Sequence, residues 1–183
     1  MKRLVIDTET TGLSPYLNKT LTVGLLLIDV EKDFLNILDK NHIFIKHDIY
    51  NHNSKASKVH NIDMNLHEEI AIPPKLACKK INSFVHKNEI QETPLVGHNI
   101  GFDKGFLNAL FDQGDSLANF HHQSEDTLSI WRHLQKRELV PQTLNGKLGT
   151  IAEHFEINHT KAHDALEDAN ITAQVYHKML RLS

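Results

Sequence analysis

Two carboxylates stand two residues apart, directly after a short apolar run near the start of the chain. Residues 4–6 (Leu-Val-Ile) predict a buried strand, and Asp7 and Glu9 follow it. Strand side chains alternate between faces, so both carboxylates point the same way. Two carboxylates a few ångströms apart repel each other, and this arrangement is typical of a divalent cation site. The pair predicts half of a metal site, although residues 10–12 (Thr-Thr-Gly) also fit a polar turn at a strand end.

Further carboxylates lie at the start of two predicted helices. Asp103 opens the helix that follows the strand over residues 94–99, where an acid can simply complement the helix dipole. Asp164, Glu167 and Asp168 crowd the first turn of the last predicted helix. The dipole explains Asp164 and Glu167, but it explains Asp168 less well because Asp168 lies one turn further on. Asp168 also adjoins a residue that is expected to be buried, so we expect it near the sheet.

The elements that must position these acids follow from hydrophobic periodicity. The strands over residues 4–6, 20–30 and 34–46 predict an antiparallel meander, and a fourth strand covers residues 94–99. Helical spacing and end signals predict five helices. They begin at Pro74, at about Phe102, at Asp126-Thr127, at about Leu148 and at about Ala165. The first carries Leu76 on its apolar face, and residues 46–65 read as a polar loop. Together these elements predict an α/β sandwich with a mixed sheet, in one domain over residues 1–183.

Composition restricts the class of protein. The chain has 183 residues, 40% of them hydrophobic and 23% charged, which is typical of a globular domain. No apolar run approaches the ~20 residues that span a bilayer, so we expect a soluble, unsecreted, cytoplasmic protein without a membrane partner. Cys78 is the sole cysteine and predicts a buried structural thiol. A net charge of −3 argues against coating long nucleic acids, which requires many Lys and Arg contacts. It leaves open a protein that grips one chain end through metals.

Taken together, the motifs resemble the DEDD superfamily of 3′-to-5′ exonucleases, in its DnaQ-like DEDDh branch. The first motif matches over residues 7–13 (Asp-Thr-Glu-Thr-Thr-Gly-Leu) and the second over residues 98–103 (His-Asn-Ile-Gly-Phe-Asp). The third matches over residues 163–168 (His-Asp-Ala-Leu-Glu-Asp), in the His form that defines this branch. The resemblance covers nearly the whole chain. It implies a ribonuclease H-like fold, in which a mixed five-stranded sheet (antiparallel meander plus parallel strands) is flanked by helices.

The resemblance also implies a site and a reaction. Asp7, Glu9, Asp103 and Asp168 would hold two divalent ions, Mg²⁺ or Mn²⁺, and His163 would be the general base. These five residues form the expected catalytic set. Oxygen ligands suit hard cations, and two such ions can stabilise the attacking and leaving oxygens of an in-line displacement. The expected activity is therefore hydrolysis of the terminal phosphodiester of single-stranded or frayed nucleic acid, with DNA favoured, which releases 5′-mononucleotides.

By the same resemblance, six residues would contact the terminal nucleotide. The backbone around Thr10 and Thr11 would meet the 3′ hydroxyl and Leu13 would wedge against a base. Val59, His60 and Phe102 are expected to stack or pack there, as end-binding by aromatic and apolar faces allows. For each of these side chains, packing in the core is the alternative interpretation. Asn61 stands where the family usually has glycine, which puts the geometry of that turn in question.

Other interpretations remain open. One is an RNA-trimming exonuclease of the ribonuclease T type, and another is a non-catalytic nucleic-acid or partner-binding module on the same fold. The motif over residues 7–11 departs from the pattern of oligoribonucleases and disfavours that reading. The partners expected are 3′ ends of single-stranded DNA or RNA. Because the chain stops just past the last predicted helix, a free-standing nuclease is expected rather than a dedicated polymerase subunit. Roles in proofreading and DNA repair, association with a polymerase, and a homodimer are all left untested by the sequence.

Overall fold

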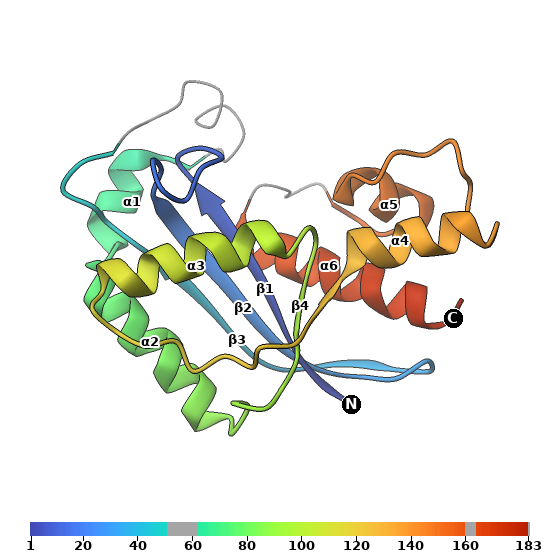
Figure 1. Ribbon diagram of the computed structural model, residues 1–183, viewed down its shortest axis with the longest axis horizontal. Coiled ribbons are helices and arrows are strands. Elements are labelled where there is room, and N and C mark those ends of the chain that lie inside the picture. The colour runs from blue at the N-terminus through green and yellow to red at the C-terminus, as the bar shows by residue number, and fades with distance from the viewer. Residues whose placement is uncertain (51–61, 160–163, 183) are drawn as a thin grey trace.

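The computed structural model describes residues 1–50, 62–159 and 164–182. Within them, five strands form one sheet in the order β3-β2-β1-β4-β5 (Figure 1). The first three strands pair antiparallel, and β4 and β5 add parallel to the edge of β1. The mixed five-stranded sheet expected from the sequence is confirmed. The strands are β1 (Lys2–Thr10), β2 (Thr20–Val30), β3 (Leu35–Phe44), β4 (Leu95–Gly97) and β5 (Ser124–Asp126).

Helices cover both faces of this sheet. The pair α2 and α3 packs on one face, and α6 lies across β1, β2 and β3 on the other, with α4 and α5 packed against α6 (Figure 1). No helix in the described part of the chain is long and apolar enough to span a bilayer. The helices are α1 (Met64–Ile70), α2 (Pro74–Lys87), α3 (Gly101–Gln113), α4 (Thr127–Lys136), α5 (Leu148–His154) and α6 (Ala165–Leu180).

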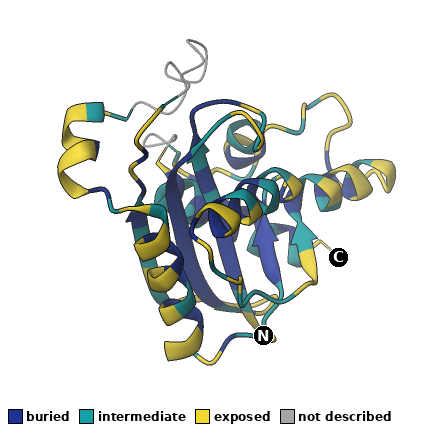
Figure 2. Cartoon of the chain, turned by 60° about the vertical axis from the view of Figure 1, so that its left-hand side comes forward, coloured by how far each residue is buried: buried dark blue, intermediate teal, exposed yellow. Residues whose placement is uncertain are grey.

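The alternation of side chains along β1 explains how the two helical layers are held. Leu4 and Ile6 are buried in the core cluster that contains residues of α2 and α3, whereas Val5 is buried with Ala169 and Tyr176 of α6. The adjacent strand β2 is covered on both faces, which accounts for its nearly continuous apolar sequence. Figure 2 shows these central strands as the most buried part of the molecule. The face on which Val5 lies therefore continues to Asp7 and Glu9, toward α6.

A close approach of backbones sets the start of α6 beside β1. Gly24 of β2 pairs with Asp7 of β1. A Cβ built on Gly24 would lie 2.3 Å from the carbonyl oxygen of Ala165, so only glycine lets the first turn of α6 rest on the sheet here. As a result, the acidic first turn of α6 lies over the strand pair that carries Asp7.

The structure places Asp7 and Glu9 within β1 rather than after it, and it corrects the element assignment from sequence in three further places. Residues 64–70 form the helix α1, whereas the sequence predicts a polar loop that extends to residue 65. The three-residue strand β5 completes the sheet, whereas the residue pattern locates only four strands. In α2, Leu76 is 44% exposed and lies off the apolar face, which carries Ala77 and Ile81. Cys78 of the same helix is buried, as expected.

Candidate active site

The carboxylates of Asp7, Glu9 and Asp168 come together between β1 and the first turns of α6. One ligand atom from each lies within 4.8 Å of the other two, and all three residues are partly buried. Asp7 and Glu9 share a face because of the strand period, and α6 brings Asp168 to that face. Among the described residues, this is the one group of three or more His, Cys, Asp or Glu side chains whose ligand atoms lie close enough together to hold a metal ion. Carboxylate oxygens at this spacing suit Mg²⁺ or Mn²⁺, which prefer oxygen ligands.

Asp103 approaches the cluster from the opposite face of the sheet. It lies in the first turn of α3 and is only 3% exposed. Its Oδ1 accepts a 2.8 Å hydrogen bond from the hydroxyl of Thr8, which alternates with Asp7 and Glu9 on β1. The pairing of β1 with β4 ends at Val5 opposite Val96, after which the chain turns into α3. Asp103 therefore reaches the edge of β1 beyond that pairing and is held there by Thr8.

Burial and the charges of neighbouring acids raise the pKa values of Asp7, Glu9 and Asp103. Burial first, and then the charges of Asp103 and Asp168, raise the pKa of Asp7 well above its usual range. For Glu9, burial and the charges of Asp168 and Asp164 raise the pKa to about 8. Burial raises the pKa of Asp103 to about 7, although the hydrogen bond from Thr8 acts in the other direction. A set of acids that resist ionisation together is the electrostatic state that a bound cation relieves.

The start of α6 is fixed by Asp164. Its side chain accepts hydrogen bonds from the backbone N–H groups of Leu166 and Glu167, at 3.1 and 3.0 Å, and so caps the helix. Its second carboxylate oxygen lies 3.7 Å from Nδ1 of His42 on β3. The sequence explains Asp164 by the helix dipole, and the structure shows in addition that its side chain caps α6. Because Asp164 directly follows residue 163 and precedes Asp168 by one turn, this cap sets where the third motif enters the site.

The loop after β1 exposes apolar side chains while its polar groups turn inward. Leu13 is 83% exposed, and its contact with a base stays a prediction. Thr11 is fully buried, its backbone N–H donates to the carbonyl of Lys19, and its hydroxyl accepts from the N–H of Lys19. The hydroxyl of Thr10 donates to the carbonyl of Gly12. In this arrangement both threonines support the loop, and their contact with a terminal nucleotide stays a prediction.

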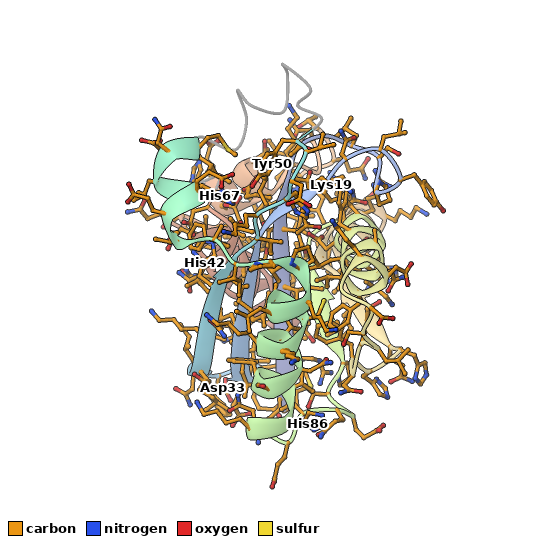
Figure 3. The ribbon with its side chains drawn as sticks, turned by 90° about the vertical axis from the view of Figure 1, so that its left-hand side faces the viewer. Lys19, Asp33, His42, Tyr50, His67 and His86 are labelled. Atoms are coloured by element: carbon orange, nitrogen blue, oxygen red, sulfur yellow. The ribbon has the colours of Figure 1, made fainter. Side chains whose placement is uncertain are left out.

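The remaining predicted contacts divide between described and undescribed residues. Phe102 is partly buried, and its ring centroid lies 4.8 Å from that of Phe106. Figure 3 shows Lys19 at the end of the loop after β1 and on the same side of the molecule as Tyr50 and His67. Val59, His60 and His163 lie outside the described residues, so their roles stay predictions.

The sequence pattern does not indicate two supports of the site, His98 of the second motif and Asp126 outside it. His98 is buried enough that its pKa is lowered, so it is neutral at pH 7. Its Nε2 donates to the carbonyl of Gly146 and its Nδ1 lies 2.9 Å from the hydroxyl of Thr127. Asp126 caps α4 and also accepts from the backbone N–H of Asn99, which has a positive φ of 62°. The sequence showed Asp126 as a helix start, but only tertiary pairing reveals its link to the second motif.

Comparison with known proteins gives a family and several relatives. A family model described as exonuclease, RNase_T, matches residues 4–176. The chain is 30% identical over 178 residues to a DNA polymerase III PolC-type protein of Caldanaerobacter subterraneus subsp. tengcongensis, covering 97% of this chain but 11% of that protein. It is 30% identical over 181 residues to ribonuclease T of Wigglesworthia glossinidia brevipalpis, covering 94% of this chain and 81% of the relative. The chain thus corresponds to a small part of the polymerase and to most of the ribonuclease.

Solved structures show the same fold at low sequence identity. The zinc-bound complex of Escherichia coli exonuclease I with single-stranded DNA superposes with a TM-score of 0.81 at 18% identity, covering 96% of this chain and 40% of that one. The nuclease domain of 3′hExo, described as a DEDDh family member and bound to rAMP, gives a TM-score of 0.79 at 17% identity. That match covers 98% of this chain and 91% of the other. The ribonuclease H-like arrangement expected from the motifs is confirmed at the level of the fold.

Proposed function

Because the chain belongs to the RNase_T exonuclease family, we propose that it is a member of the DnaQ-like DEDDh branch and removes 5′-mononucleotides from the 3′ ends of nucleic acid. Single-stranded or frayed DNA is the favoured substrate. The observation that carries the proposal is the cluster of Asp7, Glu9 and Asp168, whose ligand atoms all lie within 4.8 Å of one another. Such a cluster is partly buried, the pKa values of Asp7 and Glu9 in it are raised, and it suits hard divalent cations.

Each residue of the catalytic set has a separate role in this proposal. Asp7, Glu9, Asp103 and Asp168 hold two divalent ions, Mg²⁺ or Mn²⁺. When bound, these ions supply positive charge that stabilises the attacking and leaving oxygens of an in-line displacement at phosphorus. His163 accepts the proton of the attacking water. Leu13 and Phe102 pack against the last base, with Thr10, Thr11, Val59 and His60 around the terminal nucleotide.

The preference for DNA rests on relatives of two kinds. PolC-type DNA polymerases recur among the similar sequences, and exonuclease I has been solved with DNA oligonucleotides. Ribonuclease T is an equally similar sequence over most of its length, so RNA trimming is the second candidate. Association with a polymerase, and with it proofreading or repair, belongs to the proposal because the polymerase relatives contain a matching segment.

A digestion assay tests the proposed activity. Labelled single-stranded DNA, a duplex with a mismatched primer end, and single-stranded RNA are incubated at equal Mg²⁺, and released mononucleotides are measured. We expect release from the 3′ end, fastest for single-stranded DNA, with Asp103→Ala as an inactive blank. Faster digestion of RNA would select the ribonuclease T type of activity. Equal inactivity on all three substrates would reject the enzyme and favour a binding module.

A substitution at His163 separates the general base from the metal ligands. His163→Ala is expected to lower kcat by ~100-fold or more, the usual contribution of a positioned general base. Because the carboxylates are unchanged, calorimetry should find Mn²⁺ uptake equal to that of the unsubstituted protein. A kcat within threefold of wild type would show that another group accepts the proton.

A further inference from the structure

The hydroxyl of Thr22 in β2 is buried and unpaired. Thr22 is only 1% exposed, and its Oγ1 has no hydrogen-bond partner within the described part of the chain. A buried hydroxyl without a partner costs free energy. Valine has nearly the same shape and also favours strands, so folding alone gives no reason for a hydroxyl in this largely apolar strand. Positions that break a local rule in this way are expected at functional sites.

The register of the sheet places Thr22 directly opposite Glu9. Strand β2 lies between β1 and β3, and Thr22 pairs with Glu9 on one side and with Phe44 on the other (Figure 1). Residues directly opposite each other in an antiparallel pair point to the same face, with their Cβ atoms about 4.5–5.5 Å apart. Phe44 has no polar side-chain atom. Glu9 is therefore the polar residue that faces Thr22 across the strand pair.

On this face, β2 runs beneath the first turn of α6. Gly24, two residues further along β2, pairs with Asp7, and α6 rests on the sheet at that glycine. Thr22 and Gly24 therefore lie opposite the two clustered acids of β1. A second polar side chain, His42, pairs with Gly24 and so lies at the roughly 7–8 Å spacing of diagonal neighbours from Thr22. Glu9 is thus the nearer acceptor for the hydroxyl.

Another threonine of the site shows what such a hydroxyl can do. Thr8 donates to Oδ1 of Asp103 at 2.8 Å, from the opposite face of β1. Carboxylates that ligate a cation are themselves held by hydrogen bonds of this kind, because the donor fixes the orientation of the ligand oxygen. Glu9 contributes one oxygen to the clustered ligand atoms, which leaves its second oxygen available for a donor. Thr22 carries the hydroxyl that lies on the same face as that carboxylate.

We propose that Thr22 is a positioning residue for Glu9, and that its hydroxyl donates to the Glu9 oxygen that does not ligate the cation. The inference rests on the proposed function, which supplies Glu9 as a metal ligand, and adds a residue to that site. The bond is not made in the structure, and it forms when a cation fixes the carboxylate. Removal of the hydroxyl therefore has two opposite consequences, a more stable metal-free protein and weaker binding of the metal.

Thr22→Val tests both consequences, because it removes the hydroxyl and keeps the shape. In EDTA its melting temperature should lie ~2 °C or more above that of the wild type. After removal of the EDTA, calorimetry should give a Kd for Mn²⁺ that is ~10-fold higher or more. Thr22→Ser restores the hydroxyl and should bind Mn²⁺ within about threefold of the wild type. Thr172→Val is the matched control. The Thr172 hydroxyl is also buried without a partner but belongs to α6, so this variant should raise the melting temperature and leave the Kd unchanged.

Activity on a single-stranded DNA oligonucleotide gives a second readout. The Mn²⁺ concentration that supports half-maximal rate should rise ~10-fold in Thr22→Val. The kcat at saturating Mn²⁺ should stay within about threefold of the wild type, because every group that ligates the cation is unchanged. If valine disturbs the packing, Thr22→Ser and Thr22→Ala form a second pair that differs by one oxygen, and only the alanine variant should weaken Mn²⁺ binding.

The opposite results would overturn the role of Thr22. An unchanged Kd for Mn²⁺ in Thr22→Val, or equal weakening in the serine and alanine variants, would show that the hydroxyl does not serve Glu9. A lower melting temperature of Thr22→Val in EDTA would show that the hydroxyl is already paired. If the wild type binds no Mn²⁺, the proposed catalytic set is wrong and this proposal falls with it. If the wild type binds Mn²⁺ but cleaves no nucleic acid, the proposed function alone is wrong, and calorimetry still decides whether Thr22 positions Glu9.

Discussion

Asp7→Asn is expected to lower nuclease activity by at least ~1,000-fold and, in the metal-free protein, to raise the melting temperature. The loss of activity follows because asparagine supplies a neutral oxygen where the proposed ions need a carboxylate. The gain in stability has a separate cause. Asp7 is strained electrostatically by burial and by the charges of Asp103 and Asp168, and an amide of the same shape removes that cost.

The expected rise in melting temperature is ~2 °C or more. Relief of 1 kcal/mol or more of repulsion shifts the melting temperature of a chain of this size by ~2–4 °C per kcal/mol. Thermal unfolding is followed by circular dichroism at pH 8 in EDTA. Asp112→Asn serves as the matched control, because Asp112 is an exposed acid of α3, and it should change neither activity nor melting temperature. A less stable metal-free Asp7→Asn protein would contradict the assignment of Asp7 to a repulsive cluster.

Asp7→Asn is expected to lower activity and raise stability because the site gathers acids that repel one another until a cation binds. The four acids come from β1, α3 and α6, so folding brings them together against their mutual repulsion. The core cluster of β1, β2 and α6 supplies the stability that makes this arrangement tolerable. The fold therefore positions the acids, and the cation proposed to bind there would offset the cost.

The parts of the fold with strong periodicity could be predicted from the sequence. The strand over residues 20–30 is observed with those limits, and α2 begins at Pro74, because buried apolar patterns and a proline at the first helical position are strong local signals. Helix α1 was missed because Leu66 and Ile70 are about half exposed and the helix has no apolar face. Its one local signal is Asp63, whose side chain caps the helix by accepting from Asn65 and Leu66.

The candidate site could be predicted in part for similar reasons. The strand period placed Asp7 and Glu9 on one face, and the structure brings both to Asp168. The bond from Thr8 to Asp103 could not be found in this way, because Thr8 lies on the opposite face of β1 and meets Asp103 only through packing of α3.

Metal-free protein is expected to lose stability as pH rises from 6.5 to 8. An acid whose pKa is higher in the folded state keeps a proton that the unfolded chain has already released, so raising the pH favours unfolding until the folded pKa is passed. The pKa of Asp103 is raised to about 7, that of Glu9 to about 8, and that of Asp7 well above its usual range. These values place the loss between the usual carboxylate pKa of ~4 and about pH 8.

The titration of buried histidines does not mask the expected fall in the free energy of unfolding between pH 6.5 and 8. Burial lowers the pKa of His42, His47 and His98, so the folded protein gains stability from them as pH rises toward the unfolded histidine value of ~6.5 and no more above it. Between pH 6.5 and 8 the carboxylates therefore act largely alone. We expect the free energy of unfolding, from urea titrations in EDTA, to fall by ~2 kcal/mol across this interval.

With a divalent metal bound, the free energy of unfolding should rise with pH instead of falling. Mn²⁺ binds ionised carboxylates, so its stabilisation increases with pH and reaches ~2.7 kcal/mol at a free concentration of 100 times Kd. Asp7→Asn should flatten the fall in EDTA and abolish most of the gain from Mn²⁺, since one of the coupled acids is gone, whereas Asp112→Asn should leave both curves unchanged. An unfolding free energy in EDTA that is constant from pH 6.5 to 8 would mean that Asp7, Glu9 and Asp103 ionise like exposed acids. In that case the cluster would have no electrostatic reason to bind a cation, and the proposed catalytic set would lose its physical basis.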